Sequence, residues 1–201
     1  MLMKHRGLLR RRVAVLLDAI EDDYQAEILR GIVQESSRAN VDLVCIAGGV
    51  VSDDATHPSH SRNFLFDLFD PKSVDGILIL SGALGNALGP QKFATWVERY
   101  RGTPLVNLGL EIPDFDSIEI DGARAMFELV DHVIRVHGKT RVAFLRGPIT
   151  SQDAEQRYEA YRAALESNGI AFDPALVCSG TWHRECGSVA VREWLGVRNL
   201  H

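Results

Sequence analysis

One arginine, Arg157, stands where a strand, a loop and a helix would bring it to a ligand. Residues 141–148 (RVAFLRGP) look like a buried strand running into a glycine-proline loop, and residues 154–169 have the pattern of an amphipathic helix closed by a glycine. Arg157 lies in the first turn of that helix and faces the carboxyl end of the sheet, where open α/β sheets bind ligands. Its planar guanidinium suits paired oxygen atoms. The alternative is a surface arginine paired with Glu155 or Glu159.

Further candidate ligand contacts lie at the ends of expected strands, in the loops that follow them, or at the starts of the next helices. They are Asp18, Tyr24, Ser81, Asn107, Asp121, Ser151 and Asp153. Taken singly, such residues are typical of turns and helix caps. Asp121 suits an N-cap, a role that can coexist with ligand binding. For Tyr24, stacking on a sugar or base and packing in the core are equally open.

The sequence contains none of the motifs that mark common catalytic sites. Loop 81–89 is rich in glycine, but its spacing is not that of a dinucleotide-binding loop, so we expect a flexible loop beside the ligand. Residues 138–140 (GKT) imitate the end of a Walker motif but lead into a strand. Cys178, His183 and Cys186 are spaced too irregularly to predict a metal site. We therefore predict neither a metal nor a cofactor.

Apolar runs of strand length alternate with helical patterns along the chain, which predicts a doubly wound α/β fold with parallel sheets. The expected strands are 13–17, 43–47, 76–80, 104–108, 117–120, 141–145 and 176–178. The expected helices are 22–39 (beginning at residue 22, 23 or 24), 62–70, 90–101, 121–137, 154–169 and 184–195. Helix 62–70 is expected to turn Phe64, Leu65, Leu68 and Phe69 inward, and Cys45 is expected to be a small buried hydrophobe.

Composition and charge point to a globular binding protein. The chain has 201 residues, of which 46% are hydrophobic and 24% charged, as in ordinary soluble domains. The net charge of the chain is −5. The first twelve residues hold five Lys or Arg side chains and no acidic one, so they carry +5 and the remaining residues carry −10. An acidic body argues against a nucleic-acid surface. Neither a signal peptide nor a membrane span is evident, and three cysteines form no disulfide framework, so we predict a cytoplasmic protein.

Segments along nearly the whole chain, residues 13–195, match a known pattern in order and spacing. They are 12–18 (RVAVLLD), 24–32 (YQAEILRGI), 74–79 (VDGILI), 104–108 (PLVNL), 117–122 (SIEIDG), 136–141 (VHGKTR), 144–148 (FLRGP) and 157–169 (RYEAYRAALESNG). Together they resemble the ligand-binding core of lac-repressor-type regulators, the LacI/GalR family. The resemblance implies a periplasmic-binding-protein-like fold, in which two Rossmann-like subdomains close on a small ligand in a cleft.

On this resemblance, residues 1–12 are a basic segment, 13–138 the first ligand-binding subdomain, and 139–201 the start of an incomplete second one. Family regulators also carry an N-terminal helix-turn-helix and continue further, so the resemblance implies a sensor module whose output domain lies elsewhere. Arg157 and Asp121 match ligand-contacting family positions and are expected on opposed rims of the cleft. A homodimer through the outer helices of the first subdomain is also implied, with Ile28, Leu29 and Ile32 lining or supporting it.

The predicted function is therefore sensing of a small polar metabolite, a sugar or nucleoside-like molecule, and not catalysis. One alternative is a nucleotide- or flavin-dependent Rossmann-type enzyme with its cofactor at 82–89. A second is a transport-type receptor, which would need an export signal. A third is direct DNA binding by the basic segment, for which twelve residues are too short to form the helical motif.

Overall fold

The computed structural model describes residues 10–182 and 184–198. The chain divides into two compact units, residues 1–119 and 120–201. We call them the first unit and the second unit and describe each by itself. Of the expected basic segment 1–12, residues 1–9 lie outside the described residues. Within the part that is described, no helix combines the length and the apolar character needed to cross a membrane.

The first unit is built on a parallel five-stranded sheet in the order β2-β1-β3-β4-β5. Its strands are β1 (Arg12–Leu17), β2 (Asp42–Ala47), β3 (Gly76–Ile79), β4 (Leu105–Leu108) and β5 (Asp116–Ile118). Its α-helices are α1 (Asp23–Ala39), α2 (Phe64–Leu68), α3 (Ser81–Leu84) and α4 (Pro90–Val97). The chain runs from β1 outward to β2 and then returns across β1 to β3, so the strand order reverses beside the carboxyl ends of β1 and β3. That reversal is where doubly wound sheets open a ligand crevice.

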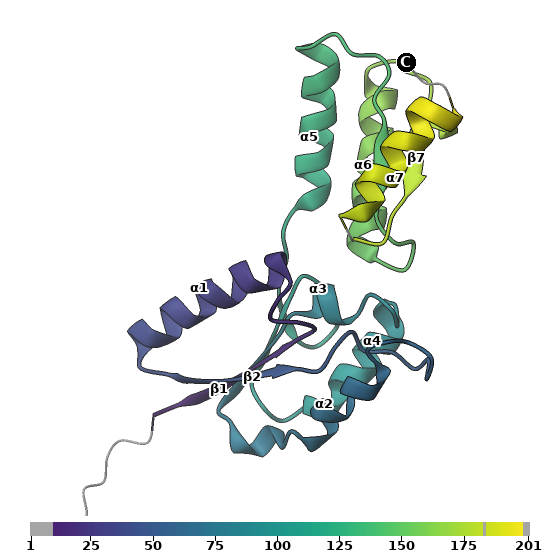
Figure 1. Cartoon of the computed structure of the whole chain (residues 1–201). Helices are drawn as coiled ribbons and strands as arrows, with labels where there is room; N and C mark the ends of the chain where they lie inside the picture. The colour runs from purple at the N-terminus through teal and green to yellow at the C-terminus, as the bar shows by residue number, and fades with distance from the viewer. Residues whose placement is uncertain (1–9, 183, 199–201) are drawn as a thin grey trace, which may run out of the picture. The chain divides into compact units, whose positions relative to one another are not determined.

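Helices cover both faces of this sheet, which confirms the predicted α/β class (Figure 1). On one face, Ile28 and Leu29 of α1 pack against Val15 and Leu17 of β1. On the other face, α2 and α4 contribute to a larger apolar cluster that includes Phe93, which is fully buried. The central strands read as continuous apolar runs because both of their faces are covered.

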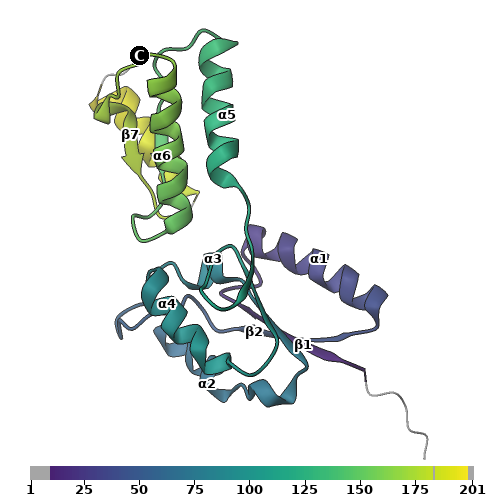
Figure 2. The same ribbon diagram turned by 180° about the vertical axis from the view of Figure 1, so that it is seen from behind.

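The second unit contains a parallel pair of strands, β6 (Phe144–Arg146) and β7 (Val177–Ser179). Its helices are α5 (Gly122–Arg135), α6 (Gln152–Ser167) and α7 (Glu185–Arg192), the last followed by a π-helical turn, Glu193–Val197. Figure 2 shows α5 beside α6, and Val130 of α5 shares a buried cluster with Tyr161 and Leu165 of α6. This packing places α5 in the second unit, so the division falls after Glu119 and not after Gly138 as expected.

Most expected elements are present, with three local corrections. Cys45 is exposed, together with Val44, because β2 is an edge strand with β1 as its neighbour. Phe64 and Leu68 are exposed and Phe66 is the buried member of α2, because this helix is a single short turn. The sixth strand begins at Phe144, later than the expected 141.

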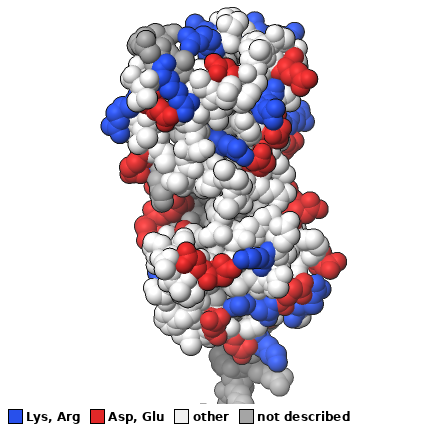
Figure 3. All heavy atoms as spheres, turned by 90° about the vertical axis from the view of Figure 1, so that its right-hand side faces the viewer, with Lys and Arg blue, Asp and Glu red and all other residues white. Residues whose placement is uncertain are grey.

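Charged side chains of both signs are interspersed on the face of the molecule displayed in Figure 3. Oppositely charged side chains of the described part of the chain also form surface ion pairs, such as Arg99–Asp67 at 2.7 Å and Arg124–Glu128 at 2.8 Å. A nucleic-acid-binding surface would instead gather its basic residues into a patch or stripe. The described residues in this view (Figure 3) form no basic patch or stripe of that kind.

Candidate functional site

In the second unit, Arg157 lies in the second turn of α6 and not in its first as expected, because the helix begins at Gln152 and not at Ala154. The hydroxyl of Ser151 caps this helix by accepting from the backbone N–H of Ala154 at 3.3 Å. The guanidinium of Arg157 donates to the carboxylate of Asp153, one turn earlier, at 2.6 Å. The alternative pairing with Glu155 or Glu159 is therefore wrong in detail. About a third of each paired side chain is exposed, at 33% for the arginine and 34% for the aspartate, so both can reach a ligand.

Two glycines make room for this pair and for an aromatic ring beside it. A Cβ atom on Gly122 would come within 2.8 Å of the Arg157 Nε. A Cβ atom on Gly147, which follows β6, would come within 2.5 Å of the Trp182 ring. The Arg157 Cζ atom lies 5.7 Å from the centre of that ring. The arrangement offers an aromatic face next to a guanidinium and a carboxylate, which suits a ring that carries hydroxyl groups.

Trp182 is the functional candidate that sequence reasoning missed. It follows β7 in the loop after Ser179, its side chain is 49% exposed, and its φ of 68° is unusual for a bulky residue. Strained residues of this kind cluster at ligand sites. Trp182 lies just beyond a strand end, as Asp18 does. The sequence indicates the strand β7 only weakly, so this position of Trp182 was not recognised.

Asp121 caps α5, because its carboxylate accepts from the backbone N–H of Arg124 at 2.9 Å. The predicted capping role is confirmed. Its neighbour Gly122 touches Arg157, so Asp121 and Arg157 belong to the same unit. The expectation that they occupy opposed subdomains is therefore wrong, because α5 packs with α6.

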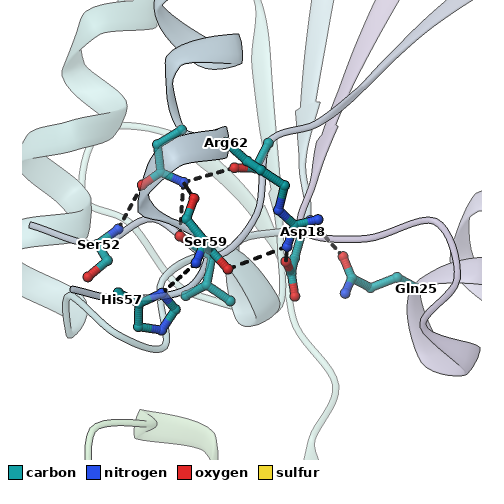
Figure 4. A network of polar contacts seen from close by, with 9 residues as sticks. Asp18, Gln25, Ser52, His57, Ser59 and Arg62 are labelled. Carbon is teal, nitrogen blue, oxygen red and sulfur yellow. Dashed lines mark hydrogen bonds and ion pairs between the residues drawn. The ribbon is translucent and has the colours of Figure 1, made fainter. Parts of the chain in front are cut away.

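In the first unit, Asp18 follows β1 and is the centre of a polar network (Figure 4). Its backbone N–H donates to the Gln25 side-chain oxygen at 2.9 Å, and its carboxylate lies 3.5 Å from the Arg62 guanidinium. Burial raises the pKa of Asp18 above its ordinary value, while Arg62, the backbone of Val50 and the Gln25 side chain oppose that rise. The carboxylate is nonetheless accessible, with 22% of the side chain exposed. Nearby, Tyr24 is 56% exposed in the first turn of α1, so the core-packing alternative is wrong.

Ser81 and Asn107 are fully buried and are not available to a ligand in this structure. The Ser81 hydroxyl donates to the Leu108 carbonyl at 3.1 Å and accepts from the Leu110 N–H at 3.1 Å, which ties the end of β3 to the end of β4. The Asn107 amide has no hydrogen-bond partner among the described residues. Both were expected at the ligand because they lie near strand ends. Asn107 instead takes an inward-facing position in the alternation of β4, and Ser81 is buried as the first residue of α3.

The other motifs give no site. Loop 81–89 begins as the four-residue helix α3. Among the described residues, no group of three or more His, Cys, Asp or Glu side chains is placed to hold a metal ion. His183, one of the weak metal candidates, lies outside the described residues.

Comparison with known proteins identifies transcriptional regulators as relatives. No family model matches the chain. The repressor CytR of Escherichia coli is 28% identical over 188 residues, which cover 92% of this chain and 51% of the repressor. The ribose operon repressor of Escherichia coli is 24% identical over 184 residues, 91% of this chain and 52% of the repressor. The chain thus spans about half the length of these curated relatives, which are repressors and not enzymes.

Solved structures agree on the fold. The transcription regulator CcpA of Lactococcus lactis superposes with a TM-score of 0.70 at 25% identity, over 92% of this chain and 64% of that one. The complex of the regulator CelR with cellobiose superposes with a TM-score of 0.68 at 24% identity, over 92% of this chain and 56% of that one. The predicted periplasmic-binding-protein-like fold is confirmed by these likenesses.

Proposed function

Because this chain is homologous to LacI-family regulators over 92% of its length, we propose that it is the effector-sensing part of a transcriptional regulator or a related signalling protein. Its ligand is a sugar or nucleoside-like molecule. The work of the chain is binding and signalling, not catalysis, and its expected location is the cytoplasm.

The observation that carries this proposal is the cluster of Arg157, Asp153 and Trp182. A sugar presents an apolar ring face and a rim of hydroxyl groups. The indole of Trp182 suits the ring face, while Arg157 and Asp153 offer donors and acceptors to the hydroxyls within one site. One structural neighbour, CelR, was solved with cellobiose bound, which supports a sugar as the ligand class.

Signalling requires that the ligand prefer one conformation of the sensor. We propose that Asp18 and Tyr24 of the first unit contact the same ligand as the cluster of the second unit. A ligand that engages both sets of side chains stabilises a closed state and shifts the population that an output domain reads. Variants in either unit should then weaken the same ligand.

A homodimer is the proposed assembly, and the first unit offers surfaces for it. Ile28, Leu29 and Ile32 are partly buried against the sheet, so we expect them to support α1 beneath such an interface. Val44 and Cys45 on the edge strand β2 are exposed and are better candidates for contact with a second copy. The mass of the protein in solution, measured by light scattering, tests this.

The test of the proposed function is a thermal-shift screen against sugars, nucleosides and amino acids. A ligand that binds the folded state at well above its dissociation constant raises the melting temperature by several degrees. Arg157→Ala should remove the shift and change unliganded melting by less than about 2 °C, because a partly exposed ion pair contributes little stability. Arg162→Ala on the same helix, where the arginine pairs with Glu159, is the matched control and should keep the shift.

A glycine substitution provides an independent check. Gly122→Ala places a methyl group 2.8 Å from the Arg157 Nε, so the guanidinium must move and affinity should fall roughly tenfold, the cost of one misplaced charged hydrogen bond. Gly187→Ala, where a Cβ meets nothing within 4 Å, should leave affinity unchanged. An undiminished shift in both Arg157→Ala and Gly122→Ala would refute the role of this cluster.

A further inference from the structure

The loop between β2 and α2 is built around one side chain, that of Asn63. The Asn63 amide nitrogen donates to the carbonyls of Gly48 at 2.8 Å, Val50 at 3.0 Å and Ser59 at 3.2 Å. Its oxygen accepts from the backbone N–H of Ser52 at 3.1 Å. These four contacts of one amide reach residues along the whole loop and hold the loop in one conformation after β2.

This loop delivers Arg62 to the end of β1. The guanidinium passes over Gly49, where a Cβ would come within 3.2 Å of the Arg62 Nε. It approaches the Asp18 carboxylate at 3.5 Å and the Ser59 hydroxyl at 3.4 Å. A guanidinium has five N–H donors, these two contacts are long, and 45% of the side chain is exposed. Arg62 therefore has donors left for a ligand.

Asp18 and Arg62 together present an acceptor beside a donor. In a pair of adjacent hydroxyls, one can donate to the carboxylate while its neighbour accepts from the guanidinium. A phosphate or carboxylate group fits less well, because Asp18 and the nearby Asp22 repel it. The tight Arg157–Asp153 pair at 2.6 Å differs from this open pair, which leaves room for a ligand to bridge the two side chains.

We infer that Asp18 and Arg62 form a specificity-determining pair of the first unit that recognises adjacent hydroxyl groups on an uncharged ligand. The inference rests on the proposed sensing function and adds to it the group that this wall recognises. Asn63 acts as a positioning residue, since it holds the loop that carries Arg62.

The test uses matched compounds that differ by one hydroxyl of an adjacent pair: ribose and 2-deoxyribose, uridine and 2′-deoxyuridine, glucose and 2-deoxyglucose. Titration calorimetry of the full chain should show at least about a tenfold preference for the diol member of one pair, the effect expected of a charge-assisted hydrogen bond. Arg62→Gln and Asp18→Asn should each reduce that preference to about twofold. Arg62→Lys keeps the positive charge but loses the planar guanidinium, so its preference for the diol should lie between those of the wild type and Arg62→Gln.

The matched control is Arg99→Gln, which removes an arginine of the same unit that pairs with Asp67 at 2.7 Å. It should keep the full preference, and circular dichroism should show that all variants are folded. Unchanged preference in Arg62→Gln, or tighter binding of ribose 5-phosphate than of ribose, would overturn the assignment. A wild-type shift produced only by an amino acid and lost in Arg157→Ala would overturn the diol pair but leave the sensing function standing. If no compound raises the melting temperature, both the assignment of the Asp18–Arg62 pair and the proposed sensing function are overturned.

Discussion

At the scale of single residues, Asp18, a proposed ligand contact, lies where burial disfavours its charged form. Its carboxylate is largely buried, and burial raises its pKa despite the opposing Arg62, Val50 and Gln25. Asp22 adds to the rise. A raised pKa means that the ionised form is less favourable in the folded state than in the unfolded chain. A carboxyl group that is disfavoured in this way at the end of a strand supports the proposal that Asp18 contacts a ligand.

Replacing Asp18 by asparagine should separate binding from stability. The contribution of a carboxyl with a raised pKa is fully present below its unfolded pKa and is lost as the pH rises through the folded value. Relative to Asp18→Asn, the wild type should therefore become more stable as the pH falls from neutral into the acid range. At pH 7 the free energy of unfolding of the variant should be within about 1 kcal/mol of the wild-type value, or higher than it, while the affinity for the ligand falls. Urea unfolding at several pH values measures this, and a difference that is independent of pH would contradict it.

The sequence predicts which residues lie at strand ends and helix caps better than it predicts the direction in which their side chains point. Strand ends and helix caps locate Asp18, Asp121 and Ser151, which the structure places directly after β1 and at the N-caps of α5 and α6. It could not predict that Asn107 turns inward, since that depends on which face of β4 each position takes. Arg62 was missed as a ligand candidate because it is brought to Asp18 by a loop whose conformation depends on Asn63, fifteen residues from Gly48.

At the scale of elements, capping residues and apolar periodicity are enough to predict most helices. Asp22 caps α1 by accepting from the backbone N–H of Gln25 at 2.9 Å, and Asn40 ends the helix in a left-handed conformation. Pro90 opens α4 as its first residue. The boundary between the two units was not predictable in the same way, because it depends on the packing of α5 against α6, which no local pattern encodes.

A glycine inside α1 provides a test of this element. Gly31 lies within the helix, and a Cβ atom there would meet nothing within 4 Å. Gly31→Ala should raise the free energy of unfolding by about 0.5–1 kcal/mol, because alanine loses less backbone entropy on folding. Gly138→Ala is the contrasting variant: its site is equally open, but its φ is +63°, so alanine should destabilise. Chemical denaturation compares the two, and destabilisation by both would show that Gly31 packs against another surface, such as a second copy.

At the scale of the whole molecule, the two units repeat one design with different completeness. The β6–α6–β7 segment has the same parallel arrangement as β1–α1–β2. In the first unit three more strands extend the sheet, whereas the described part of the second unit pairs two short strands. A sheet of two strands has little stability of its own and depends on the helices packed around it. The two units should therefore differ in stability.

Hydrogen exchange on the full chain should resolve that difference. The amides of β1 and β3 lie in the middle of a five-stranded sheet and should exchange only on global opening of the first unit. The amides of β6 and β7 should exchange at least about tenfold faster, which corresponds to an opening free energy lower by about 1.4 kcal/mol. The proposed ligand contacts side chains of both units, so it should slow amide exchange in β6 and β7 and also in β1. Equal protection of β1 and β6 without ligand would show instead that the two units open as one cooperative structure.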